Sequence, residues 1–426
     1  MSLLLSIPFP YRLTALFVLG VCLGSLVNLA VYRLAWNRRA ISPWSRPPKG
    51  GPARRGDDRV PIFGWLGLRR EAALHGSGFW IRPMLVEVLC GFGLPWLYWW
   101  EIHEGALLPF VFAPVPVSLL LAMHVQFVGH VLLITLMLIA SLIDADEKTI
   151  PDYVTVPGTL LGLFLAAVYP WSLLPAAAVP VPQPEVIFLR LTAPLDWPAW
   201  LGGFPSLGSL GVGLGCWWLW CVGLLPRTWY ARHGWRRAFG LFWSRLRRDA
   251  STRPILLLGL FGSVAISLVW FSGSGRWAAF VPRWEGLLTA LVGMAAGGGI
   301  IWAVRIIGKA VLQKEAMGFG DVTLMAMIGA FLGWQACLII FFLAPLAGLV
   351  IGLIILALRR DHEIPYGPFL CLATLVILLR WASFWNAVSG IFALGLIVPL
   401  ILLVCLGLMA VLLGLWRLIQ HLLGWA

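Results

Sequence analysis

Long apolar stretches, separated by short polar segments, recur from one end of this chain to the other. A helix of about 20 apolar residues crosses a hydrocarbon layer of about 30 Å and satisfies its own backbone groups there. The pattern therefore predicts an all-α fold, a polytopic transmembrane helix bundle. We expect about eleven spans, at residues 12–32, 84–100, 116–143, 153–170, 207–225, 254–272, 286–306, 322–340, 341–358, 366–386 and 388–416.

The composition agrees with a membrane as the solvent, since 60% of the 426 residues are hydrophobic and only 12% are charged. The net charge of +13 does not indicate nucleic acid, because the basic residues cluster in loops and are not interleaved with stacking aromatics. The seven cysteines fall in or beside apolar segments, and no CxxC pair occurs. Neither a disulfide scaffold nor a zinc site is expected.

The distribution of basic residues predicts an orientation. Residues 33–82 contain eleven Arg or Lys against three acidic residues, so this loop should be cytoplasmic and the N-terminus should lie outside. Counting spans from there places the Arg-rich loop 226–253 inside and the Pro-rich loop 171–206 outside. The stretch 39–60 has no apolar periodicity, and we expect an extended or mobile loop there.

Two acidic motifs stand out against this apolar background. Asp144 ends the third predicted span, and Asp321 follows Gly318 and Gly320 at the start of the eighth. The orientation places both at the cytoplasmic boundary. Two neighbouring carboxyl groups cannot both ionise readily, so one can act as a base toward water while the other acts as an acid. The glycines would allow unusual backbone angles and the close approach of a substrate strand.

These motifs resemble those of the prepilin peptidases, the type IV leader peptidases of the GxGD aspartic protease group. The first family motif, an Asp seven residues before Pro-Asp, is met by Asp144 and Pro151-Asp152, and the second by Gly318-Phe319-Gly320-Asp321. Four further segments resemble family landmarks in the same order: Gly24–Asn28, Val60–Trp65, Pro83–Glu87 and Ile364–Phe369.

The resemblance implies a membrane aspartic endopeptidase of type IV pilus or type II secretion systems, with Asp144 and Asp321 as the catalytic residues. Gly318, Gly320 and Glu87 would shape the site or contact the substrate. The expected partners are the N-terminal helix of a prepilin or pseudopilin and membrane lipids, at the cytoplasmic face of the bacterial inner membrane. Cleavage requires no cofactor in this family. Many members also methylate the new N-terminus, so S-adenosylmethionine is expected if that activity is retained.

The chain departs from the family pattern in two regions. The family's cytoplasmic loop often contains CxxC pairs that bind zinc, whereas residues 33–82 contain no cysteine, so zinc is not expected. Between the two acidic motifs the chain has an additional pair of predicted helices. The expected organisation is a first transmembrane helix (1–32), a cytoplasmic loop region (33–82), helices with the first motif (83–170), inserted loops and two helices (171–285), helices with the GxGD motif (286–386) and an extra C-terminal helix (387–426).

Other functions remain open at this stage. GxGD also occurs in presenilin-like intramembrane proteases, although this chain has neither their Pro-Ala-Leu motif nor their Tyr-Asp pair. A transporter, or an inactive homologue that acts as a scaffold of the pilus or secretion machinery, is a further alternative. Asp144 could cap a helix end and Asp321 could be a helix N-cap. Glu87 could form a structural pair with an arginine.

Overall fold

The computed structural model describes most of the chain. The described residues are 7–47, 51–109, 115–177, 186–195, 206–225, 252–273, 281–312, 317–357 and 365–422, with 237, 240, 243–244 and 248–249 between them. The predicted Arg-rich loop 226–253 therefore lies largely outside the described residues.

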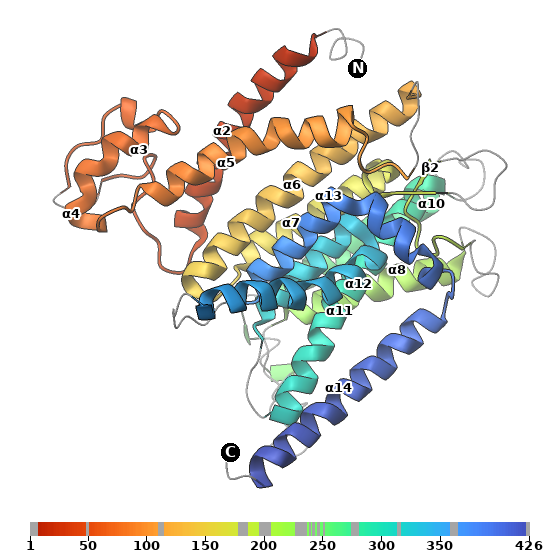
Figure 1. Ribbon diagram of the computed structural model, residues 1–426. Coiled ribbons are helices and arrows are strands. Elements are labelled where there is room, and N and C mark those ends of the chain that lie inside the picture. The colour runs from red at the N-terminus through yellow and green to blue at the C-terminus, as the bar shows by residue number, and fades with distance from the viewer. Residues whose placement is uncertain are drawn as a thin grey trace.

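The described residues form a helical bundle (Figure 1). Eight of their helices are long and apolar enough to cross a membrane, which confirms an all-α, multi-pass membrane protein. The long helices are α2 (Phe9–Leu34), α5 (Ile81–Tyr98), α6 (Val117–Glu147), α7 (Asp152–Val168), α8 (Leu207–Leu224), α10 (Thr252–Ser272), α11 (Val281–Leu312), α12 (Phe319–Ala357), α13 (Gly367–Phe392) and α14 (Ile397–Leu422).

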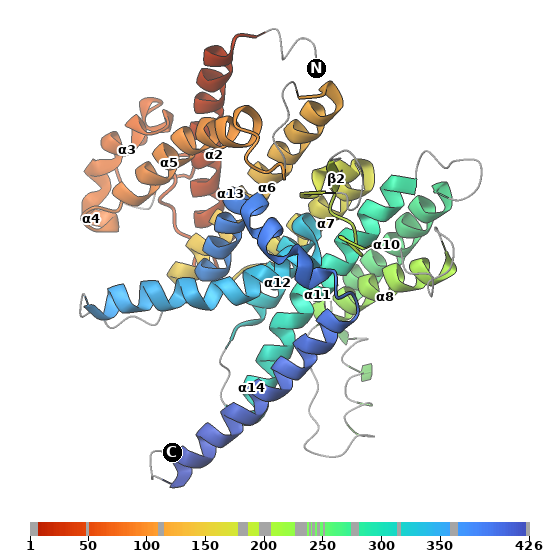
Figure 2. The same cartoon turned by 45° about the vertical axis from the view of Figure 1, so that its right-hand side comes forward.

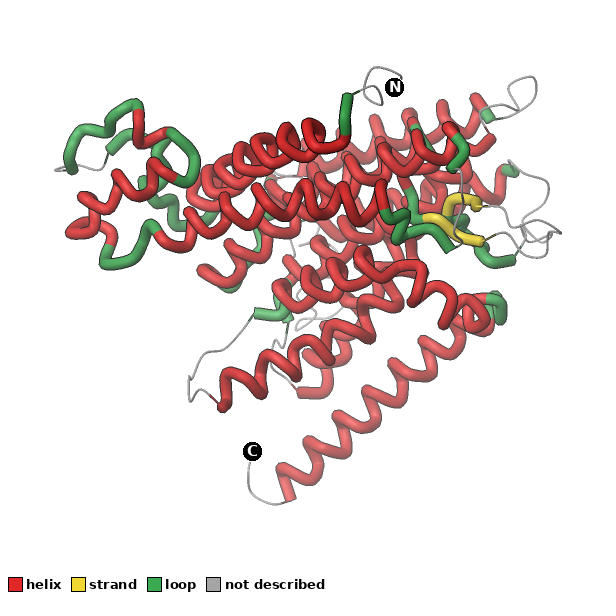
Figure 3. The backbone as a smooth tube through the Cα atoms, turned by 45° about the horizontal axis from the view of Figure 1, so that its top comes forward, coloured by secondary structure: helices red, strands yellow, loops and turns green. Residues whose placement is uncertain are grey.

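The shorter elements gather at the two ends of the bundle. The helices α3 and α4 lie at one end and the β-hairpin lies at the opposite end (Figure 3). The short elements are η1 (Asp57–Arg59), α3 (Phe63–Gly67), η2 (Leu68–Glu71), α4 (Ala72–His75), η3 (Trp99–His103), η4 (Pro170–Ser172), β1 (Pro175–Ala177) and β2 (Val186–Phe188). The two strands pair antiparallel, with Pro175 opposite Phe188. The apolar periodicity did not predict this hairpin.

The predicted spans 322–340 and 341–358 are corrected by the structure. Both belong to α12, which is interrupted at Gly333, where φ is 83° and ψ is 170°. Because φ is positive, only glycine adopts this conformation without strain. Gly333 also packs closely on Gly293 of α11, where an added Cβ would lie 2.8 Å from the Cα of Gly333. The division of α12 therefore falls earlier than the boundary between residues 340 and 341 that the sequence predicts.

In the C-terminal region the boundary between the last two helices is also displaced from the predicted position. Helix α13 continues to Phe392 and α14 begins at Ile397, whereas the sequence places the last span at 388–416. Gly395, with φ of 60°, lies in the connection. Helix α14 extends away from most of the bundle (Figure 2), and Arg417 near its end donates to the carbonyl of Val311 at 2.6 Å. Most of its apolar surface is exposed, as expected for a helix surrounded by lipid.

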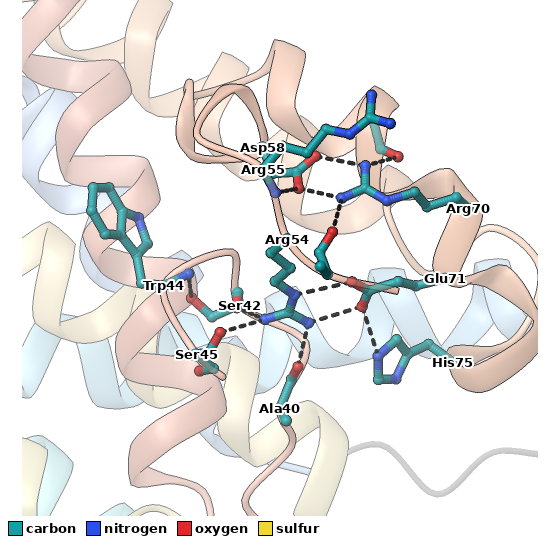
Figure 4. Close-up of polar contacts among 12 residues, drawn as sticks. Ala40, Ser42, Trp44, Ser45, Arg54, Arg55, Asp58, Arg70, Glu71 and His75 are labelled. Atoms are coloured by element: carbon teal, nitrogen blue, oxygen red, sulfur yellow. Dashed lines mark hydrogen bonds and ion pairs between the residues drawn. The ribbon is translucent and has the colours of Figure 1, made fainter. Parts of the chain in front are cut away.

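The first loop is residues 33–82, and its described part is held together by buried ion pairs (Figure 4). Arg54 contacts Glu71 at 2.9 Å, and their side chains are 4% and 0% exposed. Arg54 also donates to the carbonyl of Ala40 at 2.6 Å, which fixes the start of the loop. Asp58 pairs with Arg70. The expected irregular backbone is present over much of 39–60, but these contacts hold its described part in place.

The predicted insertion packs beside the main bundle and shares one hydrophobic cluster with α7, α11 and α12. Helix α8 lies against α10 and α11 (Figure 2). Trp217 of α8 is 2% exposed and donates through Nε1 to the carbonyl of Gly259 in α10 at 2.9 Å. A Cβ at Gly262 would lie 2.1 Å from the Trp217 ring, so the two helices touch where the small residue faces the large one. The insertion is thus a packed helix pair.

Candidate active site

Asp144 lies in the last turn of α6, and its side chain is turned into the protein. The residue is 4% exposed. Lys148 ends the helix in the left-handed conformation, with φ of 54°, and its N–H donates to the carbonyl of Asp144 at 2.8 Å. This C-cap turns the chain toward Pro151 and the start of α7. A residue at this turn would normally face solvent, so the burial of its carboxyl group needs a reason other than capping.

Asp321 lies in the first turn of α12 and is 6% exposed. A Cβ at Gly320 would lie 2.7 Å from the Cβ of Ile150, in the connection that follows Asp144. Gly320 therefore lets the start of α12 pack directly on the segment after α6. Neither Gly318 nor Gly320 has a positive φ, so the unusual backbone angles expected from the sequence are not present.

The start of α13 completes the site. A Cβ at Gly367 would lie 2.5 Å from Oδ2 of Asp144 and 2.9 Å from Cδ1 of Ile150, so this position has room only for glycine. The backbone amide of Gly367 faces the carboxyl group of Asp144. Tyr366 directly precedes Gly367. Its burial and the nearby Asp321 raise the pKa of its hydroxyl group to about 12. No sequence signal marked either Gly367 or Tyr366 as a site residue, although both lie in the Ile364–Phe369 landmark.

The structure brings the two predicted aspartates together. Their carboxyl groups lie close enough to interact electrostatically with each other. The thiol of Cys371 in α13 lies within electrostatic range of both. Oδ2 of Asp144 is buried and has no hydrogen-bond partner among the described residues. A buried polar atom without a partner costs stability, so its presence at a pair of carboxyl groups is typical of a reactive site. The N-termini of α12 and α13 both point into this region and favour negative charge there.

Arg305 of α11 supports the segment that leads to Asp321. Its Nε donates to the carbonyl of Met317 at 2.9 Å, and its guanidinium group lies 5.9 Å from the centre of the Phe319 ring. It also interacts electrostatically with Asp321. The sequence gave no signal for this contact, because an arginine within a predicted span has no identifiable partner until the helices are placed.

Glu87 has a position different from both roles considered for it. It is fully buried and accepts hydrogen bonds from the Ile62 amide at 2.5 Å and from Nδ2 of Asn28 at 3.3 Å. Its partners are therefore a backbone amide and an asparagine, and the expected arginine is absent from its contacts in the described part of the chain. Since Ile62 has a positive φ of 65°, Glu87 holds the first loop in a strained turn. None of these described contacts reaches Asp144 or Asp321.

The described residues contain no group of three or more His, Cys, Asp or Glu side chains that could hold a metal ion. The zinc that the family implies therefore does not fit the first loop, where Arg54, Glu71 and His75 meet instead. The pair at Asp144 and Asp321 offers general acid–base chemistry. One carboxylate can accept a proton from water while the other, protonated, donates to a carbonyl oxygen.

Comparison with known protein families matches two parts of the chain. The family described as bacterial peptidase A24 N-terminal domain matches residues 18–101, and the type IV leader peptidase family matches residues 247–353. The second range includes Asp321, whereas Asp144 lies between the two ranges. The role of Asp144 therefore depends on its sequence motif and on its position beside Asp321.

The chain is similar to proteins named prepilin leader peptidase/N-methyltransferase. It is 40% identical over 93 residues to the one from Aeromonas salmonicida, which is 21% of this chain and 32% of that protein. It is 37% identical over 110 residues to that of Pseudomonas aeruginosa (24% and 38%) and 31% identical over 150 residues to that of Pseudomonas putida (31% and 52%).

These matches are partial, because the chain spans about a third of the length of the first of these relatives. No solved structure matches the chain. The two matched families nevertheless occur in the order that the sequence motifs predict, on the first helices and on the GxGD segment. Over these two parts the chain is similar to the type IV leader peptidases, and the predicted resemblance to prepilin peptidases is confirmed.

Proposed function

We propose that this chain is an aspartic endopeptidase that cleaves the leader of prepilin-like or pseudopilin substrates at the cytoplasmic face of the bacterial inner membrane. One observation carries the proposal: Asp144 and Asp321, 177 residues apart in the sequence, are both buried and lie close enough for their carboxyl groups to interact electrostatically. The relatives named above support the substrate class, since prepilin leaders are what their names say they cleave.

The proposed reaction is hydrolysis by a water molecule placed between the carboxyl groups. One carboxylate removes a proton from the water as its oxygen attacks the scissile carbonyl carbon, and the protonated partner donates to the carbonyl oxygen. The tetrahedral intermediate then collapses and the peptide C–N bond breaks: the carboxyl group that took the proton from water gives it to the leaving nitrogen, and the other carboxylate takes back a hydroxyl proton as the carboxylic acid product forms. Gly367 places α13 against Asp144, and Arg305 holds the entry to α12, so both residues position the pair.

The cytoplasmic location is supported by contacts between the site and the basic first loop. Glu147, three residues after Asp144, accepts hydrogen bonds from the amides of Trp36 and Asn37 at 2.7 and 2.8 Å. Arg82, at the start of α5, pairs with Asp146 at 2.5 Å. The carboxyl pair thus lies at the end of the bundle that carries the basic loop 33–82, and loops rich in basic residues are typically cytoplasmic.

Methylation of the new N-terminus stays a prediction supported by the relatives' names. The methyl donor would be S-adenosylmethionine. A Rossmann-type nucleotide site requires a Gly-rich turn between a strand and a helix. The strands among the described residues are one antiparallel pair of three residues each. That kind of site does not fit here, and we derive no methylation step.

The proposal is tested by co-expressing the chain with a prepilin-like substrate, which has a short basic leader, a glycine and an apolar helix. Wild-type protein should shorten the substrate, and Asp144→Asn and Asp321→Asn should each abolish cleavage while remaining in the membrane. The matched control is Asp57→Asn, an exposed carboxylate in the first loop. Cleavage retained by either site variant would contradict the proposal.

The same experiment separates the alternatives. A scaffold or transporter would bind the substrate and leave it intact in the wild type. A presenilin-like protease would cut within the apolar helix, so mass spectrometry of the product distinguishes it from a peptidase that cuts at the membrane edge.

A further inference from the structure

A large groove opens beside the carboxyl pair on the side of the insertion. Its volume is about 1100 Å³, and it is bordered by the end of α2, the end of α6, the start of α7 and the inserted helices α8 and α10. Pockets for small ligands commonly measure about 300–1,000 Å³. The groove therefore has room for a segment of polypeptide.

Two isoleucines separate the groove from the carboxyl pair. Ile143 precedes Asp144, and Ile150 lies against Gly320 and Gly367 on the face opposite the groove. Both are almost completely buried, with exposures of 1% and 8%. A chain that lay in the groove would therefore need to pass only one side-chain layer to reach the proposed catalytic residues.

The walls of the groove are apolar and acidic. Among the described residues that line it are three carboxylates, Asp146, Glu147 and Asp152, and one guanidinium group, Arg39, in a protein whose net charge is +13. Asp146 already pairs with Arg82, and Glu147 accepts two backbone amides.

Asp152 differs from the other two carboxylates of the groove. It forms neither an ion pair nor a hydrogen bond with the described residues, and it is exposed at the first turn of α7. Tyr153 beside it is 80% exposed, and Trp36 on the other side of the groove is 90% exposed. The free charge and the aromatic rings complement a segment with both basic and apolar side chains.

The insertion supplies the apolar wall. Leu224 at the end of α8 and Ile255 and Leu258 of α10 line the groove. Leu224 also borders a small apolar pocket next to Phe319 and Thr323, so the end of α8 lies close to the GxGD segment. The inserted helices are therefore part of the surroundings of the site, although they lie outside the family's usual pattern.

We propose that this groove binds the positively charged segment of the substrate that precedes the scissile bond, with Asp152 as the specificity-determining residue and α8 and α10 as the apolar wall. This inference rests on the proposed function, because the apolar helix of the substrate would remain in the lipid and leave the leader on the groove side. A carboxylate at a helix N-terminus also stabilises the helix, so the test must separate the two roles of Asp152.

The probes are two synthetic peptides with the same glycine and apolar helix, one with lysines in the leader and one with glutamates at the same positions. With the full-length protein in detergent, Asp152→Asn should raise KM for the lysine peptide about fivefold, with kcat unchanged. Asp152→Lys should reverse the preference between the peptides. A merely structural role would weaken both peptides equally, and that result would overturn the proposal.

Further variants test the groove without altering α7. Thr149→Lys adds a positive charge to an exposed groove position before the helix, so it should weaken the lysine peptide and favour the glutamate peptide. Ile255→Ala should raise KM, whereas Leu256→Ala, on the exposed side of the same helix, should not. Asp57→Asn is the matched acidic control, since Asp57 is also exposed in the first turn of a short helix. Unchanged peptide preference in Thr149→Lys would contradict the groove assignment.

Binding separates this inference from the proposed function. Fluorescence anisotropy of the labelled peptides is measured on the Asp144→Asn protein, with and without the Asp152→Asn change. Charge-selective binding that depends on Asp152, without cleavage by the wild type, would overturn the proposed function and support the groove. Cleavage that is indifferent to leader charge and to Asp152 would overturn the groove alone.

Discussion

Buried acidic groups have different surroundings in the first loop and at the carboxyl pair. In the loop, Glu71 is fully buried and pairs with Arg54, and Asp58 pairs with Arg70. At the ends of α6 and α12, the buried carboxyl groups of Asp144 and Asp321 lie close enough to interact electrostatically, and Oδ2 of Asp144 has no partner among the described residues. A buried charge is tolerated when it is paired and hydrogen-bonded, and it is costly otherwise.

The difference indicates which acidic residues maintain the structure and which are available for chemistry. Glu71 and Arg70 lie in η2, and their partners Arg54 and Asp58 lie earlier in the loop, so the two pairs connect short elements and stabilise the fold of the loop. The carboxyl pair links three helix ends, and Oδ2 of Asp144 stays without a hydrogen-bond partner among the described residues, so stability alone does not explain it. Substitutions in the two regions should therefore affect different measurements.

The largest expected effect concerns the carboxyl pair. Asp144→Asn, Asp321→Asn and the double variant should each reduce cleavage by about a thousandfold or more, and the double variant should be no worse than the single ones because the two residues act as a unit. Thermal unfolding in detergent should show equal or higher stability, because a desolvated carboxyl group has been removed. A loss of stability would place the pair with the structural ion pairs.

The loop pair should show the opposite result. Glu71→Gln leaves the buried guanidinium group of Arg54 without its partner and should destabilise the protein by about 3 kcal/mol. Cleavage per folded molecule should stay close to that of the wild type. The midpoint of thermal unfolding checks the first part, with Asp57→Asn as the exposed control. Because residues 33–82 contain no cysteine and the loop is held by ion pairs, a chelator should leave the wild-type midpoint unchanged.

A smaller effect is expected at Gly367. The Cβ of an alanine would collide with Oδ2 of Asp144, so α13 or the carboxyl group must shift by a fraction of an ångström or more. Misplacement of about 1 Å near a reacting group can cost about a hundredfold in rate, so Gly367→Ala should lower kcat by about tenfold to a hundredfold. A matched control is Gly390→Ala in the same helix, where an added Cβ meets no atom within 4 Å. Equal kcat for both variants would contradict the assigned positioning role.

The smallest effect concerns pH and the second loop pair. The hydrogen bond from Arg70 holds the pKa of Asp58 below its usual value. A lowered folded-state pKa contributes stability above the pKa of the unfolded chain, near 4, and this contribution is lost as pH falls through the folded-state value. Asp58→Asn should therefore reduce stability by about 1 kcal/mol or less at pH 7 and should have no additional effect at the acidic end. Unfolding midpoints across this pH range provide the measurement.

Local sequence patterns predicted much of the fold. Apolar length predicted the helices α8 and α10 of the insertion to within two residues at each end. The bend of α12 was misplaced because both sides of Gly333 are apolar, and the turn depends on the approach of Gly293 from α11. Hydropathy contains no signal for such a contact. The β-hairpin was missed because strands of three residues are too short to show a period.

Local patterns likewise identified some of the candidate site residues and not others. Asp144 and Asp321 were identifiable because charged residues are rare at the edge of apolar spans and because both belong to short motifs. The functions of Gly367 and Arg305 depend on contacts between α13 and α6 and between α11 and the start of α12, which no local pattern specifies. For Glu87 the sequence left open a structural pair with an arginine. Its carboxylate instead accepts a hydrogen bond from the amide of Ile62.

The central claim is geometric and can be measured directly. In a Cys371→Ser background, Asp144→Cys and Asp321→Cys are combined and treated with a short bifunctional methanethiosulfonate reagent, and the digested protein is analysed by mass spectrometry. The account predicts a cross-linked peptide joining positions 144 and 321, as it does for a control pair at Asn28 and Glu87, whose side chains are 3.3 Å apart. Reagent on both cysteines without a cross-link, while the control pair is joined, would contradict it.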